Sequence, residues 1–210
     1  MASAATPEIA SDWQRGWWAR ARHCPSPNFG PRPEGCEVSL ALVHSISLPP
    51  GIYGGAEVEQ FFLNQLDVSA HPYFDALRGM RVSAHFFIRR DGECVQFVSC
   101  CERAWHAGVS QWRGRTNCND FSIGIELEGL EGERFEQVQY ARLGELLKAL
   151  DHGGRRLDVA GHQHVSVGRK ADPGLGFDWA LLMADLGWPA QYFPEELMAL
   201  SRGHRDVDSA

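Results

Sequence analysis

The chain has 210 residues, of which 44% are hydrophobic, and its formal net charge at pH 7 is -7. This length supports one domain with a sizeable core and is short for two. The net negative charge argues against a broad binding surface for nucleic acid or an anionic membrane. No stretch reaches the roughly twenty apolar residues that a membrane-spanning helix needs. We therefore expect a single globular domain with no nucleic-acid or membrane partner, in which local cations hold any anionic substrate.

Six cysteines are present, and their spacing contains no Cys-x-x-Cys pair. A chain of this size does not need disulfide bonds for stability, and its first residues lack the basic region and apolar core of an export signal. We therefore expect reduced thiols and a cytoplasmic protein.

The first half of the chain predicts one strand, one helix and one hairpin. Residues 40–46 form an apolar run typical of a short β-strand, which the Pro-Pro-Gly sequence at 49–51 must end. A helix is expected over 56–66. Two β-rich runs at 81–88 and 93–98 flank an Asp-Gly step, which is a strong hairpin signal. The hairpin strands should pair antiparallel.

A strand with two different faces is expected over residues 121–128, where apolar residues alternate with small or acidic ones. This period of two is typical of a strand that buries one face in the core. Glu126 belongs to the other face. Strands with one polar face need helices only over the apolar face.

The second half of the chain continues with helix, strand and helix. An amphipathic helix is expected over 136–150, and a Gly-Gly pair at 153–154 supplies its stop signal. A strand over 157–161 and a last helix over 178–186 follow. The segments before Cys36 and after Leu197 are expected to be arms or tails.

The most informative stretch, residues 161–174, places His162, Lys170 and Asp172 in one Gly- and Pro-containing region. A histidine and an aspartate are two of the three protein ligands that a hydrolytic zinc ion takes, and the fourth position is left to water. His44, in the apolar run at 40–46, is the best candidate for the third ligand.

Hydrolysis of an amide also requires a base and a cation that stabilises the oxyanion, and Glu126 and Lys170 suit these roles. Each candidate has a structural alternative. His44 alone is typical of a hydrogen-bonded strand residue, and an aspartate before proline is common in turns. His152 and His164 compete with His162 for the metal. The residues alone leave these alternatives open.

Five segments, in order along the chain, resemble the AmpD-type anhydro-muramyl-peptide amidases, which are zinc enzymes of the N-acetylmuramoyl-L-alanine amidase superfamily. They are VHSISLPPG (43–51), RVSAH (81–85), RAWHAG (103–108), CNDFSIGIELEG (118–129) and GHQHVSVGRKADPG (161–174). The resemblance runs from about Trp18 to Trp179. It implies one α/β (α+β) domain over 18–190, between an N-terminal extension (1–17) and a C-terminal tail (191–210).

The resemblance also implies the architecture and the metal site. The expected fold is a mixed β-sheet flanked by helices, with zinc in a surface groove. The implied zinc ligands are His44, His162 and Asp172. Glu126 would activate the water and Lys170 would stabilise the tetrahedral intermediate.

The implied reaction is hydrolysis of the amide between 1,6-anhydro-N-acetylmuramic acid and L-alanine during peptidoglycan recycling. The anhydro-muramyl peptide would stack on Trp105 and pair with Arg81 through a carboxylate, with His106 as a further contact. Ser45 stands where relatives commonly carry Asn, so its contact with substrate would differ. We expect a monomer. The alternatives are an amidase that acts on intact peptidoglycan and a non-catalytic muropeptide-binding module.

Overall fold

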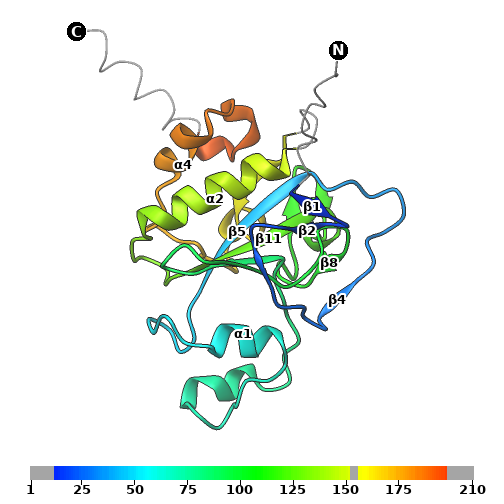
Figure 1. Ribbon diagram of the computed structural model, residues 1–210. Coiled ribbons are helices and arrows are strands. Elements are labelled where there is room, and N and C mark those ends of the chain that lie inside the picture. Colours follow the sequence, from blue (N-terminus) through cyan, green and yellow to red (C-terminus); the bar gives the residue numbers. More distant parts are fainter. Residues whose placement is uncertain (1–11, 152–155, 198–210) are drawn as a thin grey trace, which may run out of the picture.

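A six-stranded mixed β-sheet forms the centre of the molecule, in a computed structural model that describes residues 12–151 and 156–197. The strand order is β12-β5-β11-β6-β7-β3. The strands are β3 (Arg22–His23), β5 (Leu40–Ile46), β6 (Phe86–Ile88), β7 (Cys94–Gln96), β11 (Ser122–Glu128) and β12 (Asp158–Gly161). Helices α2 (Gln137–Leu150) and α4 (Trp179–Leu186) lie on one side of the sheet, and α1 (Glu57–Phe62) lies on the other (Figure 1). The expected single α/β domain with a helix-flanked mixed sheet is confirmed.

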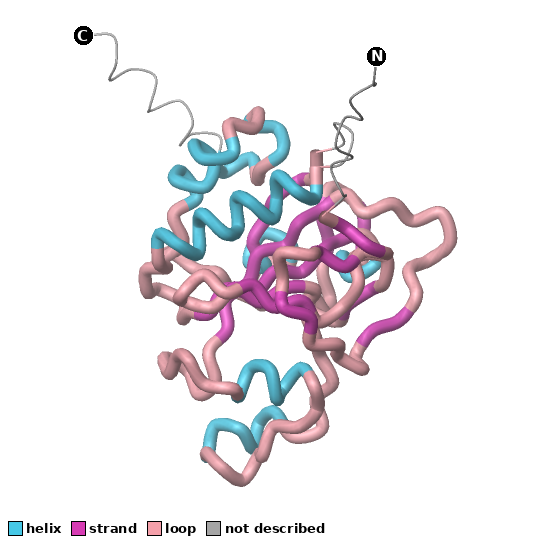
Figure 2. The backbone as a smooth tube through the Cα atoms, viewed as in Figure 1, coloured by secondary structure: helices cyan, strands magenta, loops and turns pink. Residues whose placement is uncertain are grey.

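Short elements and loops make up the rest of the described chain (Figure 2). Short strand pairs are formed by β1 (Trp13–Gln14) with β2 (Trp17–Trp18), β4 (Phe29–Gly30) with β8 (Arg103–Ala104), and β9 (Gln111–Trp112) with β10 (Arg115–Thr116). The short helices are η1 (Pro72–Leu77), η2 (Cys118–Asp120), α3 (His162–Val165), η3 (Ala190–Tyr192) and η4 (Glu195–Leu197).

Parallel pairing of three strands sets the geometry of the sheet centre. Strand β5 pairs parallel with β11 on one side and with β12 on the other. The register places His44 beside Glu126 and Val43 beside Gly161. The predicted hairpin is confirmed, because β6 and β7 pair antiparallel and Gly92 takes a positive φ of 86° in the turn between them.

Both faces of the central strands are buried, whereas the alternation predicted a strand with only one face in the core. Ile123, Ile125 and Leu127 pack in the cluster under α2 and α4. All seven residues of β11 are nevertheless buried. On the other face, Leu40 and Leu42 pack against Ala107, Cys118 and Val165, which belong to loops and short helices. The second layer is therefore mostly irregular chain, for which hydrophobic periodicity carries no signal.

The helices lie near their predicted places, with ends set by capping residues. Helix α1 ends at Phe62, before the expected end at residue 66, because Asn64 takes a left-handed φ of 60° and exchanges amide hydrogen bonds with Asn28. Asp178 caps α4 by accepting a hydrogen bond from the Leu181 N–H at 2.9 Å. The Gly-Gly stop predicted at 153–154 lies outside the described residues.

Residues 12–35, the described part of the segment before Cys36, contribute to the core and do not form an arm. Trp18 is fully buried and stacks on Trp13, with ring centroids 6.0 Å apart. Arg32 donates hydrogen bonds to four backbone carbonyl groups, those of Cys100, Asn119, Asp120 and Ser122. The N-terminal segment therefore supports the start of β11.

The chain end described beyond residue 190 also contacts the core, where Phe193 and Leu197 join the cluster under α2 and α4. The domain boundaries at 18 and 190 stay predictions. All six cysteines are free thiols, as expected. Within residues 12–151 and 156–197, no helix has the length and apolar character needed to cross a membrane.

Replacement of Trp18 tests whether the N-terminal segment stabilises the domain. Trp18→Ala should lower the free energy of unfolding by about 3 to 5 kcal/mol, because it empties a fully buried ring site. Trp17→Ala, at a half-buried neighbour, is the matched control and should cost clearly less. Urea unfolding followed by circular dichroism measures both. Equal losses for the two variants would contradict the assignment of Trp18 to the core.

Candidate metal centre and active site

Three ligand atoms converge at the carboxyl ends of neighbouring strands. His44 lies in β5, and His162 follows β12, which is the parallel neighbour of β5. Asp172 comes from the loop after α3. The two histidine Nδ1 atoms are 3.0 Å apart, and each lies 3.1 Å from Oδ2 of Asp172. All three residues are buried and together form a group that could hold a metal ion.

The hydrogen bond at Nε2 of His162 leaves Nδ1 free to bind a metal. This Nε2 atom lies 3.0 Å from the carbonyl oxygen of Ala107 and must donate, because a carbonyl oxygen only accepts. In a neutral imidazole this leaves an unshared electron pair on Nδ1, the atom that faces His44 and Asp172. Burial lowers the pKa of His44 to about 4, so the His44 imidazole is neutral at pH 7. Neutral imidazoles and a carboxylate are ligands that zinc prefers.

The ligand atoms line a groove with a volume of about 330 Å³. Its polar side carries the three ligands with Ser45, Trp105, His106, Glu126 and Lys170. Its apolar side comes mainly from the region of α1 and η1 and from nearby loops: Leu48, Phe61, Phe62, Tyr73, Leu77, Met80 and Val82. A groove with one polar and one apolar side suits a ligand of mixed character.

The Glu126 side chain is buried in this groove, on the face of β11 opposite Ile125 and Leu127. Among the described residues, its Oε2 atom has no hydrogen-bond partner. Burial raises the pKa of Glu126 well above its usual range, and the charge of Asp172 raises it further, whereas Lys170 opposes the shift. A carboxyl group with a raised pKa is suited to exchange protons near neutral pH.

The predicted site residues lie in two places. Ser45, Trp105, His106 and Lys170 line the groove of the three ligands. Arg81 does not: it is exposed and lines a separate hollow of about 170 Å³. Phe61, Leu77 and Met80 line both hollows, so the hollow of Arg81 adjoins the groove.

His164 lies apart from the ligand group. Its Nδ1 accepts a hydrogen bond from the Gly161 N–H at 2.8 Å, and its Nε2 lies 3.2 Å from Oε1 of Glu196. The ring also packs against Trp179, with centroids 5.2 Å apart. These contacts give it a structural role at the start of α3. His152 lies outside the described residues.

Asn119 and the backbone of Ala107 contribute to the site although neither was a predicted site residue. Asn119 Oδ1 accepts hydrogen bonds from the backbone N–H groups of His106 and Ala107. A lone polar side chain before a strand has no spacing signature. Only the folded structure shows that Asn119 lies close to His106.

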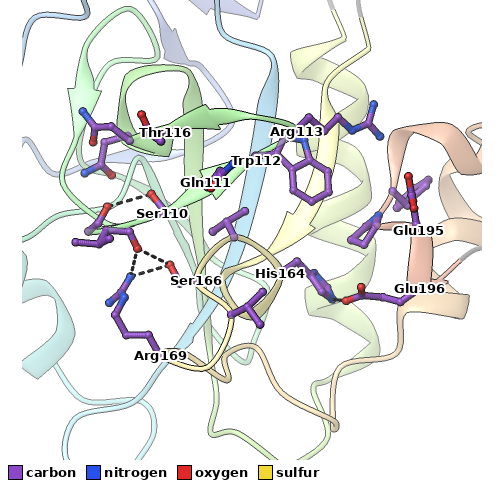
Figure 3. Close-up of a pocket in the computed structure, with 18 residues that line it drawn as sticks. Ser110, Gln111, Trp112, Arg113, Thr116, His164, Ser166, Arg169, Glu195 and Glu196 are labelled. Atoms are coloured by element: carbon purple, nitrogen blue, oxygen red, sulfur yellow. Dashed lines mark hydrogen bonds and ion pairs between the residues drawn. The ribbon is translucent and has the colours of Figure 1, made fainter.

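A larger surface hollow of about 1220 Å³ lies beside the site but contains none of the three ligands (Figure 3). Trp112 and Arg113 of the β9–β10 hairpin form one side, and His164 and Glu196 contribute to another. Arg169 also lines this hollow, and its Nη2 atom lies 2.7 Å from the carbonyl oxygen of Ala107 and 3.5 Å from Nε2 of His162.

Comparison with known proteins agrees with this geometry. The family described as N-acetylmuramoyl-L-alanine amidase matches residues 37–175. The chain is 48% identical over 171 residues to the 1,6-anhydro-N-acetylmuramyl-L-alanine amidase AmpD of Citrobacter freundii, covering 80% of this chain and 91% of that one.

Two solved structures are also similar. A selenomethionine AmpD crystal structure superposes with a TM-score of 0.80 at 47% identity, covering 82% of this chain and 98% of that one. AmiD from E. coli, solved with anhydro-N-acetylmuramic acid-L-Ala-D-γ-Glu-L-Lys, gives a TM-score of 0.52 at 26% identity, with 73% and 60% covered. The chain therefore belongs to the N-acetylmuramoyl-L-alanine amidase family.

Proposed function

We propose that this amidase hydrolyses the amide between 1,6-anhydro-N-acetylmuramic acid and L-alanine in muropeptides, in peptidoglycan recycling, with zinc as cofactor. The observation that carries the proposal is the convergence of His44, His162 and Asp172 in one groove with Glu126, whose Oε2 atom has no hydrogen-bond partner within residues 12–151 and 156–197. High identity to AmpD over most of both chains supports this choice of substrate.

Zinc held by His44, His162 and Asp172 would supply a Lewis acid, which lowers the pKa of water and polarises the amide carbonyl. The groove residues then carry out the proton and charge steps. Glu126 takes a proton from the attacking water and returns it to the leaving amine of L-alanine. Lys170 lies in the same groove and stabilises the negative charge that develops on the carbonyl oxygen.

The groove side chains suit a substrate that joins a sugar to a peptide. Trp105 offers an aromatic face for the sugar ring, and Ser45 offers a hydroxyl group near the scissile bond. Because Arg81 lines the adjoining hollow and not the groove of the ligands, it would pair with a carboxylate of the stem peptide away from the scissile bond. Arg81 would therefore affect substrate affinity more than turnover.

The six free cysteines, including the adjacent Cys100 and Cys101, support a reducing compartment, and we place the enzyme in the cytoplasm as a monomer. Anhydro-muropeptides of the recycling pathway are then the available substrates.

The substrate is tested by incubating the purified protein with an anhydro-muramyl tripeptide and, separately, with intact sacculi. Mass analysis should find free tripeptide and anhydro-N-acetylmuramic acid, at a rate well above that of stem-peptide release from sacculi. Preference for sacculi would favour the cell-wall amidase. Binding of the muropeptide without cleavage would favour the non-catalytic module.

Metal analysis separates the ligands from the base. The purified protein should contain close to one zinc per chain, and Asp172→Ala should lose it, because an aspartate ligand is removed. Glu126→Gln should keep the zinc while turnover falls by on the order of 10² to 10⁴. Asp185→Ala is the matched control, since Asp185 is exposed and pairs with Lys148. Full activity of Glu126→Gln would show that another group is the base.

The raised pKa of Glu126 predicts a pH-dependent stability of the chelator-treated protein. A carboxyl group whose pKa is higher in the folded state destabilises the fold as pH rises above the pKa of the unfolded chain. Glu126→Gln removes this cost, so the variant should exceed the wild type in free energy of unfolding at pH 7.5 by on the order of 1 kcal/mol or more. The difference should vanish near pH 4. Urea unfolding at both pH values measures it, and a less stable variant at pH 7.5 would refute the assignment.

A further inference from the structure

Two consecutive residues contact the outer nitrogen atoms of both ligand histidines. The Nε2 atom of His44 lies 2.9 Å from Nδ1 of His106, and Nε2 of His162 lies 3.0 Å from the carbonyl oxygen of Ala107. In each ligand the opposite ring nitrogen, Nδ1, points to Asp172. The 106–107 dipeptide therefore contacts both ligand histidines on the side of their rings that faces away from Asp172.

This dipeptide is itself held by one side chain. Asn119 Oδ1 accepts the N–H of His106 at 3.1 Å and that of Ala107 at 2.9 Å. Asn119 belongs to η2, which leads directly into β11. One amide oxygen thus connects the loop behind the ligands to the strand that carries Glu126.

The His106 ring is fixed by the neighbouring strand. Its Nε2 lies 3.2 Å from Oγ of Ser122, and its plane is at 89° to that of His44, with centroids 5.0 Å apart. A Cβ atom at Gly124 would lie 2.5 Å from the His106 ring, so only glycine leaves the ring this space. Both nitrogen atoms of His106 are engaged, which makes it a poor candidate for a polar substrate contact.

The Ala107 carbonyl is fixed from the other side. The Nη2 atom of Arg169 lies 2.7 Å from this oxygen and 2.7 Å from the Val109 carbonyl oxygen. It also lies 2.7 Å from Oγ of Ser166, the side chain toward which Arg169 points in Figure 3. A charged donor on a carbonyl oxygen holds it in place and leaves its second electron pair for the N–H of His162.

We propose that the 106–107 dipeptide, held by Asn119, selects the tautomer in which His44 and His162 both bind the metal through Nδ1. The inference rests on the proposed zinc site. In this tautomer, His44 donates its Nε2–H to Nδ1 of His106. His106 in turn donates its Nε2–H to Oγ of Ser122. His106 and Asn119 are then positioning residues, which act on the metal through the ligands.

Matched substitutions separate hydrogen bonding from packing. His106→Phe keeps a ring in the space above Gly124 but removes the acceptor, whereas His106→Asn keeps an acceptor oxygen near the position of Nδ1. Asn119→Leu removes the oxygen that holds the dipeptide, and Asn119→Asp retains it. Asn117→Gly is the control, because Asn117 is exposed and its φ of 57° suits glycine.

The first measurement is the zinc dissociation constant, determined by competition with a chromogenic chelator. His106→Phe and Asn119→Leu should weaken zinc binding by about 10- to 100-fold. The zinc dissociation constants of His106→Asn, Asn119→Asp and Asn117→Gly should stay within about threefold of the wild-type value. The first two variants keep a hydrogen-bond acceptor at the substituted position, and the third does not alter one. The second measurement is the set of ring ¹⁵N chemical shifts of the zinc-loaded wild type. It should find both ligand histidines metallated at Nδ1 and protonated at Nε2, with His106 protonated at Nε2 only.

The outcomes are distinct from those of the proposed activity. Unchanged zinc affinity in His106→Phe and Asn119→Leu, a proton on His106 Nδ1, or no zinc binding by the wild type would overturn the inference. Zinc binding and tautomers as expected, without cleavage of the muropeptide, would leave the inference standing and overturn the amidase proposal. Equal loss of affinity in Asn119→Leu and Asn119→Asp would also count against it.

Discussion

The parallel register of β12, β5 and β11 is the constraint on which the site depends. Parallel strands end at the same edge of a sheet, so the residues at or after their carboxyl ends are brought together from positions far apart in the sequence. His44 in β5 and Glu126 in β11 are paired neighbours on adjacent strands, and His162 directly follows β12. A shift of one residue in either pairing would turn the polar side chains into the core under α2 and α4.

Burial of both faces explains why the same strands can carry polar residues without loss of order. The face under α2 and α4 is apolar, and its packing holds the register. The other face accepts Ser122, Gly124 and Glu126 because loops cover it and supply partners for most of its polar atoms. The Oε2 atom of Glu126, which has no hydrogen-bond partner in the described part of the chain, is an exception, and it lies where the chemistry is proposed. The packed apolar face under α2 and α4 thus holds in place the polar face that carries the proposed catalytic residue.

Periodicity predicted the helices and strands that pack regularly, and family motifs predicted the ligand group. The hydrophobic face of α2 and the alternation in β11 are local patterns, so they can be read from the chain. The packing of Trp18 and the hydrogen bonds of Arg32 join distant segments through the fold, and no local pattern marks them. The contacts of Asn119 involve backbone N–H groups, which every residue except proline carries, so sequence could not reveal them.

The two sides of the groove belong to different packing units. The metal side is built on the sheet centre, whereas the apolar side belongs to the cluster of α1 and η1, where Phe61, Phe62 and Phe74 pack against Phe87 and Phe97. Changes in the apolar unit can reshape the groove without moving a ligand of the metal. Within such a division, relatives of this fold can diverge in the molecules they accept while the reaction they perform stays the same.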